Sequence, residues 1–358
     1  MRLSLSLVTF LSTSLLNESI AFAPTSTKSA IARNIYSSFS SSKVFMATDP
    51  SEIYSGSSLL DSCSQACTNS LGTDIKLKPT TGGGASGGGG ASVSAAIDEA
   101  TGKKYFIKSA SVNGGGASML RAEYLGVKEM SDTQTIKVPT PIAFGEHHGP
   151  GRDIAFCVFE YLEFCGGGSG YELGKQLATM HKQGISSQGF GFHVDNTIGA
   201  TPQPNLPWMD NWADFWDEHR LGHMLKLTYN AGLDKETVDK LRVKTRKLLS
   251  HNPQPSLIHG DLWGGNKGYA KVDGEVVPVI FDPATYYGDR EADVAMTYLF
   301  GGFGSDFYEG YEEVWPLPEG HEKRKTVYNL YHILNHDVLF GGGYIRQAQG
   351  MISQILKM

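Results

Sequence analysis

The chain has 358 residues, of which 40% are hydrophobic, with a formal net charge of −6 and four cysteines. This length is enough for a substantial hydrophobic core, and four cysteines are too few for the disulfide scaffold of a small secreted protein. The acidic balance leaves no basic patch for nucleic acid or for an anionic membrane surface.

Residues 1–48 have the composition of a targeting leader. Arg2 and an apolar stretch at residues 3–16 predict a signal peptide that is too short and polar to span a membrane comfortably. Residues 19–48 contain no Asp or Glu, three basic residues and eleven Ser or Thr, which is typical of a chloroplast transit peptide. We therefore expect a two-part plastid leader with cleavage after Ala21; a secreted or cytoplasmic protein is the alternative. Without this leader the net charge becomes about −9.

A glycine-rich tract precedes two expected strands. Residues 81–90 include seven glycines, and residues 91–97 and 105–108 have the apolar character of strands joined by a turn. Glycine lets backbone amides approach phosphate oxygens because it has no Cβ. The pattern predicts a flap over ATP, contacted by Gly87, Gly88, Gly89 and Gly90. A flexible linker is the alternative interpretation.

Lys108 ends the second of these strands, and Glu123 is its expected partner. Residues 117–130 have apolar side chains at helical spacing, with Glu123 beside the apolar stripe. A lysine at this place in a kinase-like sheet contacts the α- and β-phosphates, and it needs a carboxylate to hold it. The alternative for Glu123 is a solvated helix surface.

Residues 154–162 are expected to form a buried strand that runs into a hinge. The backbone groups of Glu160, Tyr161 and Leu162 would then contact adenine.

The second half of the chain predicts a mostly helical region, with helices at residues 169–182, 210–228, 235–250, 290–300 and 321–336. Residues 184–207 are rich in Gly, Pro, Asn and Gln, and we expect a long loop that shapes an acceptor pocket together with aromatics such as Trp208. Trp212 and Trp216 are four residues apart, so core packing is the favoured interpretation for them.

The sequences LIHGDLWGGN and VIFDP carry the strongest functional signal. Asp261 and Asn266 have the spacing of the Asp and Asn in a protein-kinase catalytic loop. Asp282 follows one hairpin later, with Asp273-Gly274 at the expected turn. The pattern predicts phosphoryl transfer, in which Asp261 accepts the proton of the attacking hydroxyl while Asn266 and Asp282 hold Mg²⁺, a cation that prefers oxygen ligands.

The alternative is that His-Gly-Asp is an ordinary turn and Asp282 a cap. Lys267, next to Asn266, either faces phosphate or is solvated.

These residues resemble the fructosamine/ketosamine-3-kinase family, a branch of the aminoglycoside- and choline-kinase-like enzymes. The resemblance covers residues 57–354 and is carried by HGDLWGGN (259–266), FDPATYYGDREADVAMTYLFGGF (281–303), EYLEFCGGGSGYELGKQLATMH (160–181) and YEEVWPLPEG (311–320). It implies an ATP-dependent kinase that phosphorylates the third-carbon hydroxyl of ketosamines and so repairs glycated amines or glycated proteins. Ribulosamine, erythrulosamine and fructosamine adducts are the implied acceptors.

The resemblance also implies roles for single residues: Asp261 as catalytic base, Asn266 and Asp282 as Mg²⁺ ligands, Lys108 with Glu123 as the phosphate anchor, and Asp293 as support for the catalytic-loop backbone. Trp263 is implied to pack beside the sugar or in the core. Many relatives carry a cysteine after the glycine triplet that is thought to form an intermolecular disulfide switch. Ala91 occupies that position here, so we expect this switch to be absent.

We therefore expect a protein-kinase-like bilobal α+β fold with an antiparallel N-lobe sheet and a helical C-lobe. The expected divisions are a leader at residues 1–48, a nucleotide-binding N-lobe at 49–160, and a catalytic, substrate-binding C-lobe at 161–358. The rivals are another small-molecule hydroxyl kinase of the choline or aminoglycoside type and a non-catalytic nucleotide-binding scaffold. The mature form is expected to bind neither nucleic acid nor membrane, and the sequence sets no oligomeric state.

Overall fold

The computed structural model describes residues 53–80, 85–86, 90–150 and 152–358. The predicted leader lies outside these described residues. The chain forms two compact units. Of the described residues, unit 1 comprises those up to Ser131 with Val138–Cys165 and Ala270–Glu275, and unit 2 comprises Asp132–Lys137, Gly166–Tyr269 and Val276–Met358.

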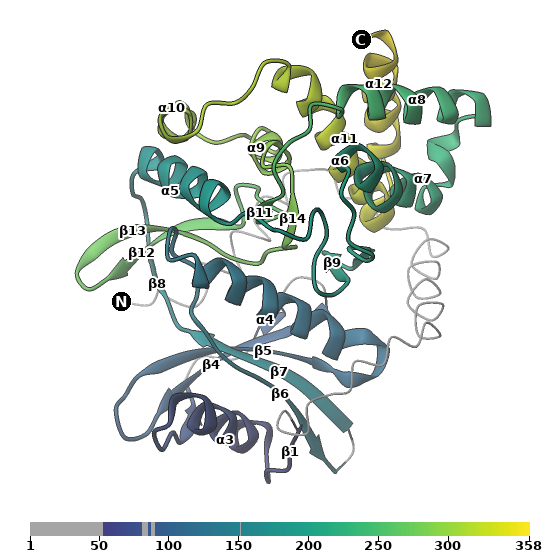
Figure 1. Cartoon of the computed structure of the whole chain (residues 1–358). Helices are drawn as coiled ribbons and strands as arrows, with labels where there is room; N and C mark the ends of the chain where they lie inside the picture. Colours follow the sequence, from purple (N-terminus) through teal and green to yellow (C-terminus); the bar gives the residue numbers. More distant parts are fainter. Residues whose placement is uncertain (1–52, 81–84, 87–89, 151) are drawn as a thin grey trace. The chain divides into compact units, whose positions relative to one another are not determined.

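Unit 1 contains a seven-stranded sheet with the order β1-β6-β7-β5-β4-β2, in which β3 also pairs with β4 (Figure 1). All pairings are antiparallel except β1 with β6. The strands are β1 Ile53–Tyr54, β2 Leu77–Pro79, β3 Ala85–Ser86, β4 Ser92–Asp98, β5 Lys104–Ser111, β6 Pro141–Gly149 and β7 Arg152–Glu160; a short β8, Glu163–Cys165, follows.

Two helices pack on the sheet of unit 1. Helix α3, Leu59–Leu71, is capped by Ser58 and Gly72, and it buries Cys63 and Cys67 in a core with Ile107 and Val158. Helix α4, Ala117–Asp132, follows the irregular turn η3, Val112–Gly116. Successive side chains of a strand point to opposite faces. Ile107 therefore faces the α3 core, whereas the next residue, Lys108, faces the other way.

Unit 2 is mostly helical (Figure 1). Its helices are α5 Gly170–Gln183, α6 Trp212–Phe215, α7 Gly222–Leu227, α8 Lys235–Leu248, α9 Glu291–Met296, α10 Ser305–Val314, α11 His321–Phe340 and α12 Tyr344–Lys357, with a π-helical turn, η4, at Trp216–Leu221 and a 3₁₀ turn, η5, at Tyr229–Gly232. Its short strands are β9 Asn196–Ile198, β10 Thr201–Gln203, β11 Ser256–Ile258 and β14 Tyr286–Gly288. The hairpin of β12, Lys267–Val272, and β13, Glu275–Ile280, links β11 to β14 along the chain.

Helix α11 lies at the centre of the core of unit 2. The Tyr328 and Tyr331 rings on α11 contact Trp216 edge-on, with ring centroids 4.9 and 5.6 Å apart, and Trp212 donates a hydrogen bond from Nε1 to the Tyr328 hydroxyl. Trp212 and Trp216 are almost completely buried, which confirms their predicted core packing. Burial of such large rings contributes strongly to stability because each removes a large apolar area from water.

Several elements differ from expectation. The loop expected at residues 184–207 contains the β9–β10 hairpin, whose Asn196 and Gln203 are buried and joined by a 2.8 Å hydrogen bond. The helix expected at 210–228 is interrupted by η4, and the one expected at 290–300 ends at Met296. Helices α3, α10 and α12 were not expected. Hydrogen bonds between buried polar side chains stabilise this hairpin, and the composition of the segment does not reveal which side chains will be buried.

Candidate active site

The loop between β11 and β12 carries the predicted catalytic residues, and its conformation depends on Gly260. Gly260 has a φ of +81°, and a Cβ at this position would lie 2.1 Å from the Ala284 carbonyl oxygen. Both the left-handed conformation and the close approach require glycine. The His259 carbonyl accepts a hydrogen bond from the Ala284 amide at 2.9 Å, so the loop lies directly against the segment that contains Asp282.

Asn266 contacts both predicted aspartates, Asp261 through its side chain and carbonyl and Asp282 through its carbonyl. Its Nδ2 donates to the Asp261 carbonyl at 2.9 Å, to Asp261 Oδ2 at 3.1 Å and to the Asp282 carbonyl at 3.3 Å. Because all three partners are acceptors, the amide nitrogen must face them, and Oδ1 points elsewhere. The structure therefore brings Asp261, Asn266 and Asp282 together and leaves the Asn266 oxygen available for a cation.

Asp282 adopts an uncommon backbone conformation. Its φ is +56°, which L-residues other than Asn and Asp seldom adopt, and the residue is exposed.

Asp261 is partly buried beside other negative charges. Burial raises the pKa of its carboxyl well above the usual range, and the carboxylates of Asp282 and Asp293 raise this pKa further, while the hydrogen bond from Asn266 opposes the shift. The cluster therefore concentrates negative charge that a bound cation would balance.

His259 connects the loop to the end of β13. Its Nδ1 accepts the Asp261 backbone N–H at 3.2 Å, so Nε2 carries the proton and donates to the Phe281 carbonyl at 3.0 Å. Burial lowers the pKa of this imidazole, which keeps it neutral. No sequence pattern predicted this role for His259.

Asp293, on α9, holds the catalytic loop through two of its backbone amides. Its Oδ2 accepts the His259 amide at 2.7 Å and its Oδ1 accepts the Gly260 amide at 2.8 Å. Burial alone would raise the pKa of Asp293, but the hydrogen bonds that it accepts from His181 and from the Gly260 amide leave the pKa below its usual value. These two bonds are the backbone contacts that the resemblance implied for Asp293.

A buried chain of polar groups holds Asp293 in turn. His181 Nε2 lies 3.1 Å from Asp293 Oδ2, and its Nδ1 lies 2.8 Å from the Tyr311 hydroxyl, which also accepts from Arg290 at 3.1 Å. Burial lowers the pKa of His181, so the neutral ring donates to Asp293 and accepts from Tyr311. No sequence pattern pointed to His181 and Tyr311, because only the fold brings together residues 130 positions apart.

In unit 1, Lys108 on β5 and Glu123 on α4 form an ion pair. The Lys108 Nζ to Glu123 Oε1 distance is 2.5 Å, and their side chains are only 10% and 17% exposed. Glu123 is therefore not on a solvated helix surface. A partly buried pair is screened little by solvent, so the geometry of Lys108 is well fixed.

The other predicted nucleotide contacts are described only in part. Gly87, Gly88 and Gly89 lie outside the described residues, while Gly90 has a φ of +89°. At the end of β7 the Glu160 amide donates to the Thr140 carbonyl at 2.9 Å, so this N–H is already used within unit 1. Tyr161 lies under the Lys104 ammonium, and Leu162 is buried.

Lys267 and Trp263 are both held by neighbouring rings. The Lys267 Nζ lies 5.1 and 5.5 Å from the ring centroids of Phe303 and Tyr269, and burial lowers its pKa, so the ammonium is not fully solvated. Trp263 contacts Phe300 edge-on at 6.3 Å between centroids. Ala91 occupies the position where the resemblance implies a cysteine in many relatives, and it is buried.

Two other features of unit 2 lie outside this site. His251, Asp289 and Glu291 could hold a metal ion by their spacing, but Arg324 donates to both Glu291 oxygens at 2.6 and 2.7 Å, and Tyr328 donates to Asp289. This cluster is therefore already neutralised by protein groups.

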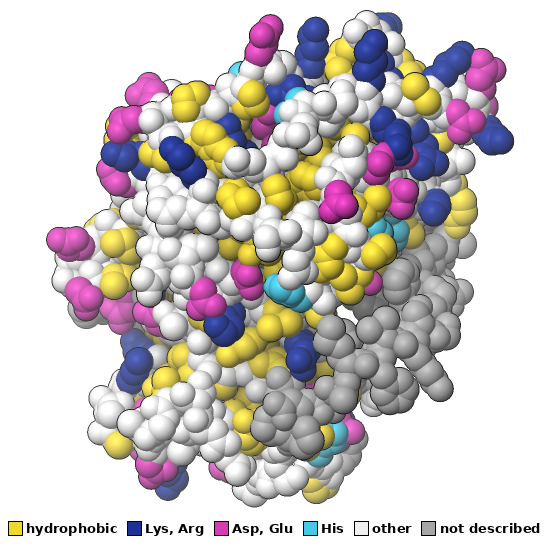
Figure 2. Space-filling model, viewed as in Figure 1, with side chains coloured by type: hydrophobic (Ala, Val, Ile, Leu, Met, Phe, Trp, Pro, Cys, Tyr) yellow, Lys and Arg dark blue, Asp and Glu magenta, His cyan; other side chains and the backbone are white. Residues whose placement is uncertain are grey.

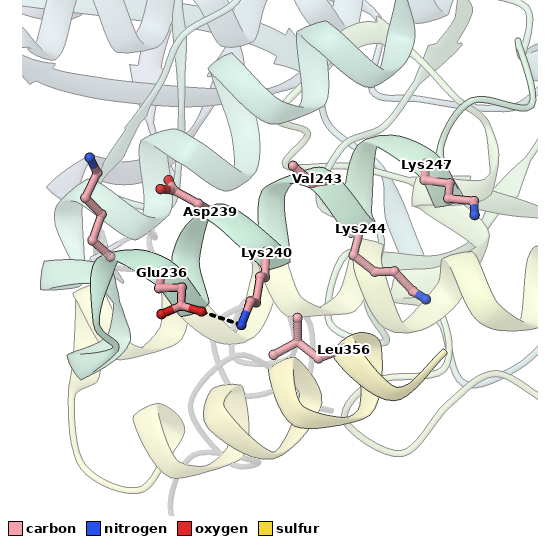
Figure 3. A pocket seen from close by; sticks show the side chains of 8 residues that line it. Glu236, Asp239, Lys240, Val243, Lys244, Lys247 and Leu356 are labelled. Carbon is pink, nitrogen blue, oxygen red and sulfur yellow. Dashed lines mark hydrogen bonds and ion pairs between the residues drawn. The ribbon is translucent and has the colours of Figure 1, made fainter.

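The second feature is a hollow of about 870 Å³ between α8 and α12, lined by lysines of α8 with Val243 and Leu356 (Figure 3). Lysine and arginine side chains gather where α8 lies (Figure 2). Its two carboxylates, Glu236 and Asp239, lie among these lysines, and Glu236 is paired with Lys240 at 2.6 Å.

The fold and this site define a kinase-like phosphotransferase. The family model for fructosamine kinase matches residues 61–358. The chain belongs to the fructosamine kinase family.

Individual relatives agree with this assignment. A probable ketoamine kinase of Synechocystis is 49% identical over 259 residues, which cover 72% of this chain and 84% of the relative. The chloroplastic protein-ribulosamine 3-kinase of Arabidopsis thaliana is 44% identical over 68% of this chain and 74% of its own. The crystal structure of a Haemophilus somnus protein assigned as a fructosamine-3-kinase superposes with a TM-score of 0.69 at 30% identity, covering 82% of this chain and 96% of that one.

The predicted α+β, protein-kinase-like fold class, the family and the class of enzyme are confirmed: the chain is an ATP-dependent phosphotransferase. Among the described residues, no helix is both long and apolar enough to cross a membrane.

Proposed function

We propose that this enzyme transfers the γ-phosphoryl group of ATP to the third-carbon hydroxyl of ketosamines. The observation that carries the proposal is the triad of Asp261, Asn266 and Asp282, joined by the Asn266 amide in a loop that Asp293 braces through two backbone amides.

Asp261 is the proposed catalytic base. Its carboxylate orients the attacking hydroxyl and accepts its proton while the sugar oxygen bonds to the γ-phosphorus and the bond from that phosphorus to the β–γ bridging oxygen breaks, releasing ADP. A raised pKa makes Asp261 a better proton acceptor than an ordinary aspartate once it is ionised. The brace through Asp293 keeps the acceptor hydroxyl aligned, which is where most of the rate enhancement in phosphoryl transfer arises.

Asn266 and Asp282 are the proposed ligands of Mg²⁺. The donor set fits this cation: an amide oxygen left free by the orientation of the Asn266 amide, and a carboxylate in a cluster with excess negative charge. When bound, Mg²⁺ neutralises phosphate charge.

The nucleotide is proposed to be anchored by residues of unit 1. Lys108, fixed by Glu123, would contact the α- and β-phosphates, and Gly87 to Gly90 would supply backbone amides. Glu160, Tyr161 and Leu162 are the proposed adenine hinge, and the Glu160 amide is bonded to the Thr140 carbonyl. In these terms residues 49–160 form the nucleotide-binding lobe and residues 161–358 the catalytic and substrate-binding lobe.

The biological role that we propose is protein deglycation in a plastid. A 3-phosphoester of a ketosamine breaks down and frees the amine, so phosphorylation would reverse glycation. The composition of residues 1–48 and the chloroplastic names of the plant relatives support the location.

A phosphorylation assay tests the proposal. Ribulosamine, erythrulosamine and fructosamine adducts of lysine are compared with choline and aminoglycosides, and the phosphate position is determined by NMR. We expect turnover of the ketosamines with phosphate on the third carbon. Preferential turnover of choline or an aminoglycoside, or phosphate at another carbon, would refute the proposal.

A further inference from the structure

A buried network of polar side chains contacts the chain just after Asp282. Gln203 Nε2 donates to the Ala284 carbonyl at 3.1 Å, and Asn196 Nδ2 donates to the Thr285 carbonyl at 2.8 Å. Both amides belong to the β9–β10 hairpin, and Gln203 Nε2 also donates to Asn196 Oδ1 at 2.8 Å. All members of this network lie in unit 2, as Asp282 does. We define the hairpin network by its side chains: Asn196, Gln203, Asn205, Arg220 and Tyr331.

Arg220, in η4, is the only cation of the hairpin network. It is completely buried, and among the described residues no carboxylate pairs with it. Its guanidinium lies 3.9 Å from the Tyr286 ring centroid, and it donates to the Pro204 carbonyl at 2.5 Å and to Asn205 Oδ1 at 2.7 Å. A guanidinium stays protonated and can only donate. The groups that bond to Arg220 must therefore present oxygen atoms to it.

This requirement fixes the orientation of the asparagines in the network. Because Asn205 Oδ1 accepts from Arg220, Asn205 Nδ2 is the group that faces Asn196, and it donates to Asn196 Oδ1 at 2.9 Å. Asn196 Oδ1 is then an acceptor, so Asn196 Nδ2 is left to donate to the Thr285 carbonyl. The direction of donation thus runs from the guanidinium through two amides to the backbone.

Gln203 is oriented by the same logic and by α11. Its Nε2 must donate because Asn196 Oδ1 accepts, and its Oε1 accepts from the Tyr331 hydroxyl at 2.6 Å. The second proton of Nε2 goes to the Ala284 carbonyl. Gln203 and Tyr331 are at most 2% exposed, so water does not compete for these bonds. Every polar atom of the Gln203 side chain is therefore committed to one arrangement.

Ala284 connects the hairpin network to Asp282 over a short distance along the chain. Only Pro283 separates the two residues, and its ring restricts φ. The Ala284 amide donates to the His259 carbonyl at 2.9 Å, while the Ala284 carbonyl accepts from Gln203. Both polar groups of Ala284 are thus held, one by the catalytic loop and one by the hairpin. The position of the Asp282 carboxylate depends on both contacts.

We propose that Asn196 and Gln203 are positioning residues for Asp282, and that Arg220 sets the orientation in which they hold the chain. This inference rests on the proposed function, because it takes Asp282 to be a ligand of Mg²⁺. Neither amide contacts the cation; both act through backbone carbonyls. Groups that fix the position of a metal ligand in this way determine how tightly the metal binds.

The test measures nucleotide binding to the full chain by calorimetry at a series of Mg²⁺ concentrations, with no acceptor present. Gln203→Met keeps the length of the side chain and removes both donated hydrogen bonds. We expect the Mg²⁺ concentration that gives half-maximal nucleotide affinity to rise about tenfold. The affinity for ATP in the absence of divalent cations should stay within about twofold, because the proposed phosphate anchor lies in unit 1.

Thr201→Val is the matched control. Thr201 lies in β10 of the same hairpin, is 2% exposed, and its hydroxyl has no hydrogen-bond partner among the described residues. Valine has the same shape, so this variant changes a buried polar residue of the hairpin without breaking a bond to the chain after Asp282. Its Mg²⁺ titration should match that of the unmodified enzyme.

Tyr331→Phe is a milder variant that decides the question if Gln203→Met does not fold. It keeps the ring that packs on Trp216 and removes only the hydroxyl that bonds to Gln203 Oε1. The Mg²⁺ midpoint should rise by about twofold to threefold, since one supporting bond is lost and the two donated bonds remain.

An unchanged Mg²⁺ midpoint in folded Gln203→Met, or in Tyr331→Phe where the first variant does not fold, would overturn the inference. An equal shift in Thr201→Val would do the same, as would equal losses of affinity for metal-free and metal-bound ATP, because these indicate general damage to the fold. Asp282→Asn separates the two levels. No shift in that variant would refute the role of Asp282 in the proposed function, whereas a shift there and none in Gln203→Met would refute this inference alone.

Discussion

The two charged clusters of this enzyme balance their charge in opposite ways. In unit 1, Lys108 and Glu123 neutralise each other across 2.5 Å, so the pair is complete by itself. In unit 2, Asp261, Asp282 and Asp293 are three acidic groups, and burial with mutual repulsion raises the pKa of Asp261. Asn266 donates to the Asp261 carboxylate, and His181 and two backbone amides donate to that of Asp293. Under the proposed function, unit 1 therefore provides a pre-formed anchor for the nucleotide, whereas a cation and a ligand would complete the unit 2 cluster.

The largest expected effect comes from the base itself. Asp261→Asn keeps the shape of the side chain but removes the proton acceptor, so kcat should fall by on the order of 10² or more. ATP binding, measured by calorimetry, should remain nearly intact. An unchanged kcat on ketosamines would show that Asp261 is not the base.

Asp282→Asn tests the need for a cation in the unit 2 cluster. It should weaken Mg²⁺-dependent binding of nucleotide by roughly tenfold or more, as a metal titration would measure. Asp273→Asn is the matched control, because Asp273 also has a positive φ of +50° at the hairpin turn and asparagine tolerates this conformation. Equal metal titrations for both variants would contradict the assignment of Asp282.

Glu123→Gln tests whether the anchor of unit 1 depends on its internal partner. Lys108 should lose its fixed position, and KM for ATP should rise about fivefold to tenfold with a smaller change in kcat. Glu163→Gln is the control, since its pair with Lys104 is exposed and contributes little. If both variants raise KM equally, the Lys108–Glu123 pair is not the anchor.

The smallest expected effect is the pH dependence of stability, which arises from the buried histidines of unit 2. Burial lowers the pKa of several of its histidines: His181, His219, His223, His259, His332 and His336. For His223 the pKa falls to about 4 and for His332 to about 3. These groups are neutral when folded and take up a proton on unfolding below about pH 6.5. Their contribution to stability is therefore complete above that pH and is lost as the pH falls towards the folded-state pKa.

The measurement is the free energy of unfolding by urea between pH 6.5 and 5. Each such histidine adds about 1.4 kcal/mol per pH unit to the loss. His223→Gln retains a donor for the Pro202 carbonyl, which lies 2.9 Å from Nε2, and it should reduce the slope by about that amount. An unchanged slope would show that His223 is protonated in the folded state.

Some features were predictable because they depend on short stretches of chain. The five-residue interval from Asp261 to Asn266 and the Asp273-Gly274 turn place the functional groups on one loop and hairpin, and the structure has β12 and β13 around that turn. The strands that carry Lys108 and the helix that carries Glu123 followed from apolar periodicity. The hairpin at residues 196–203 could not be predicted in this way, because its polar residues are typical of a loop and their buried hydrogen-bond partners are known only from the structure.

The sequence by itself therefore determined the family, the α+β class, and the identity and local spacing of the acidic, amide and lysine groups. The tertiary structure alone decided how those groups are supported: that Asp293 binds two loop amides, and that His181 and Tyr311 hold Asp293. The physical reason is that a buried polar group must find its hydrogen-bond partner wherever the fold brings one, at any distance along the chain.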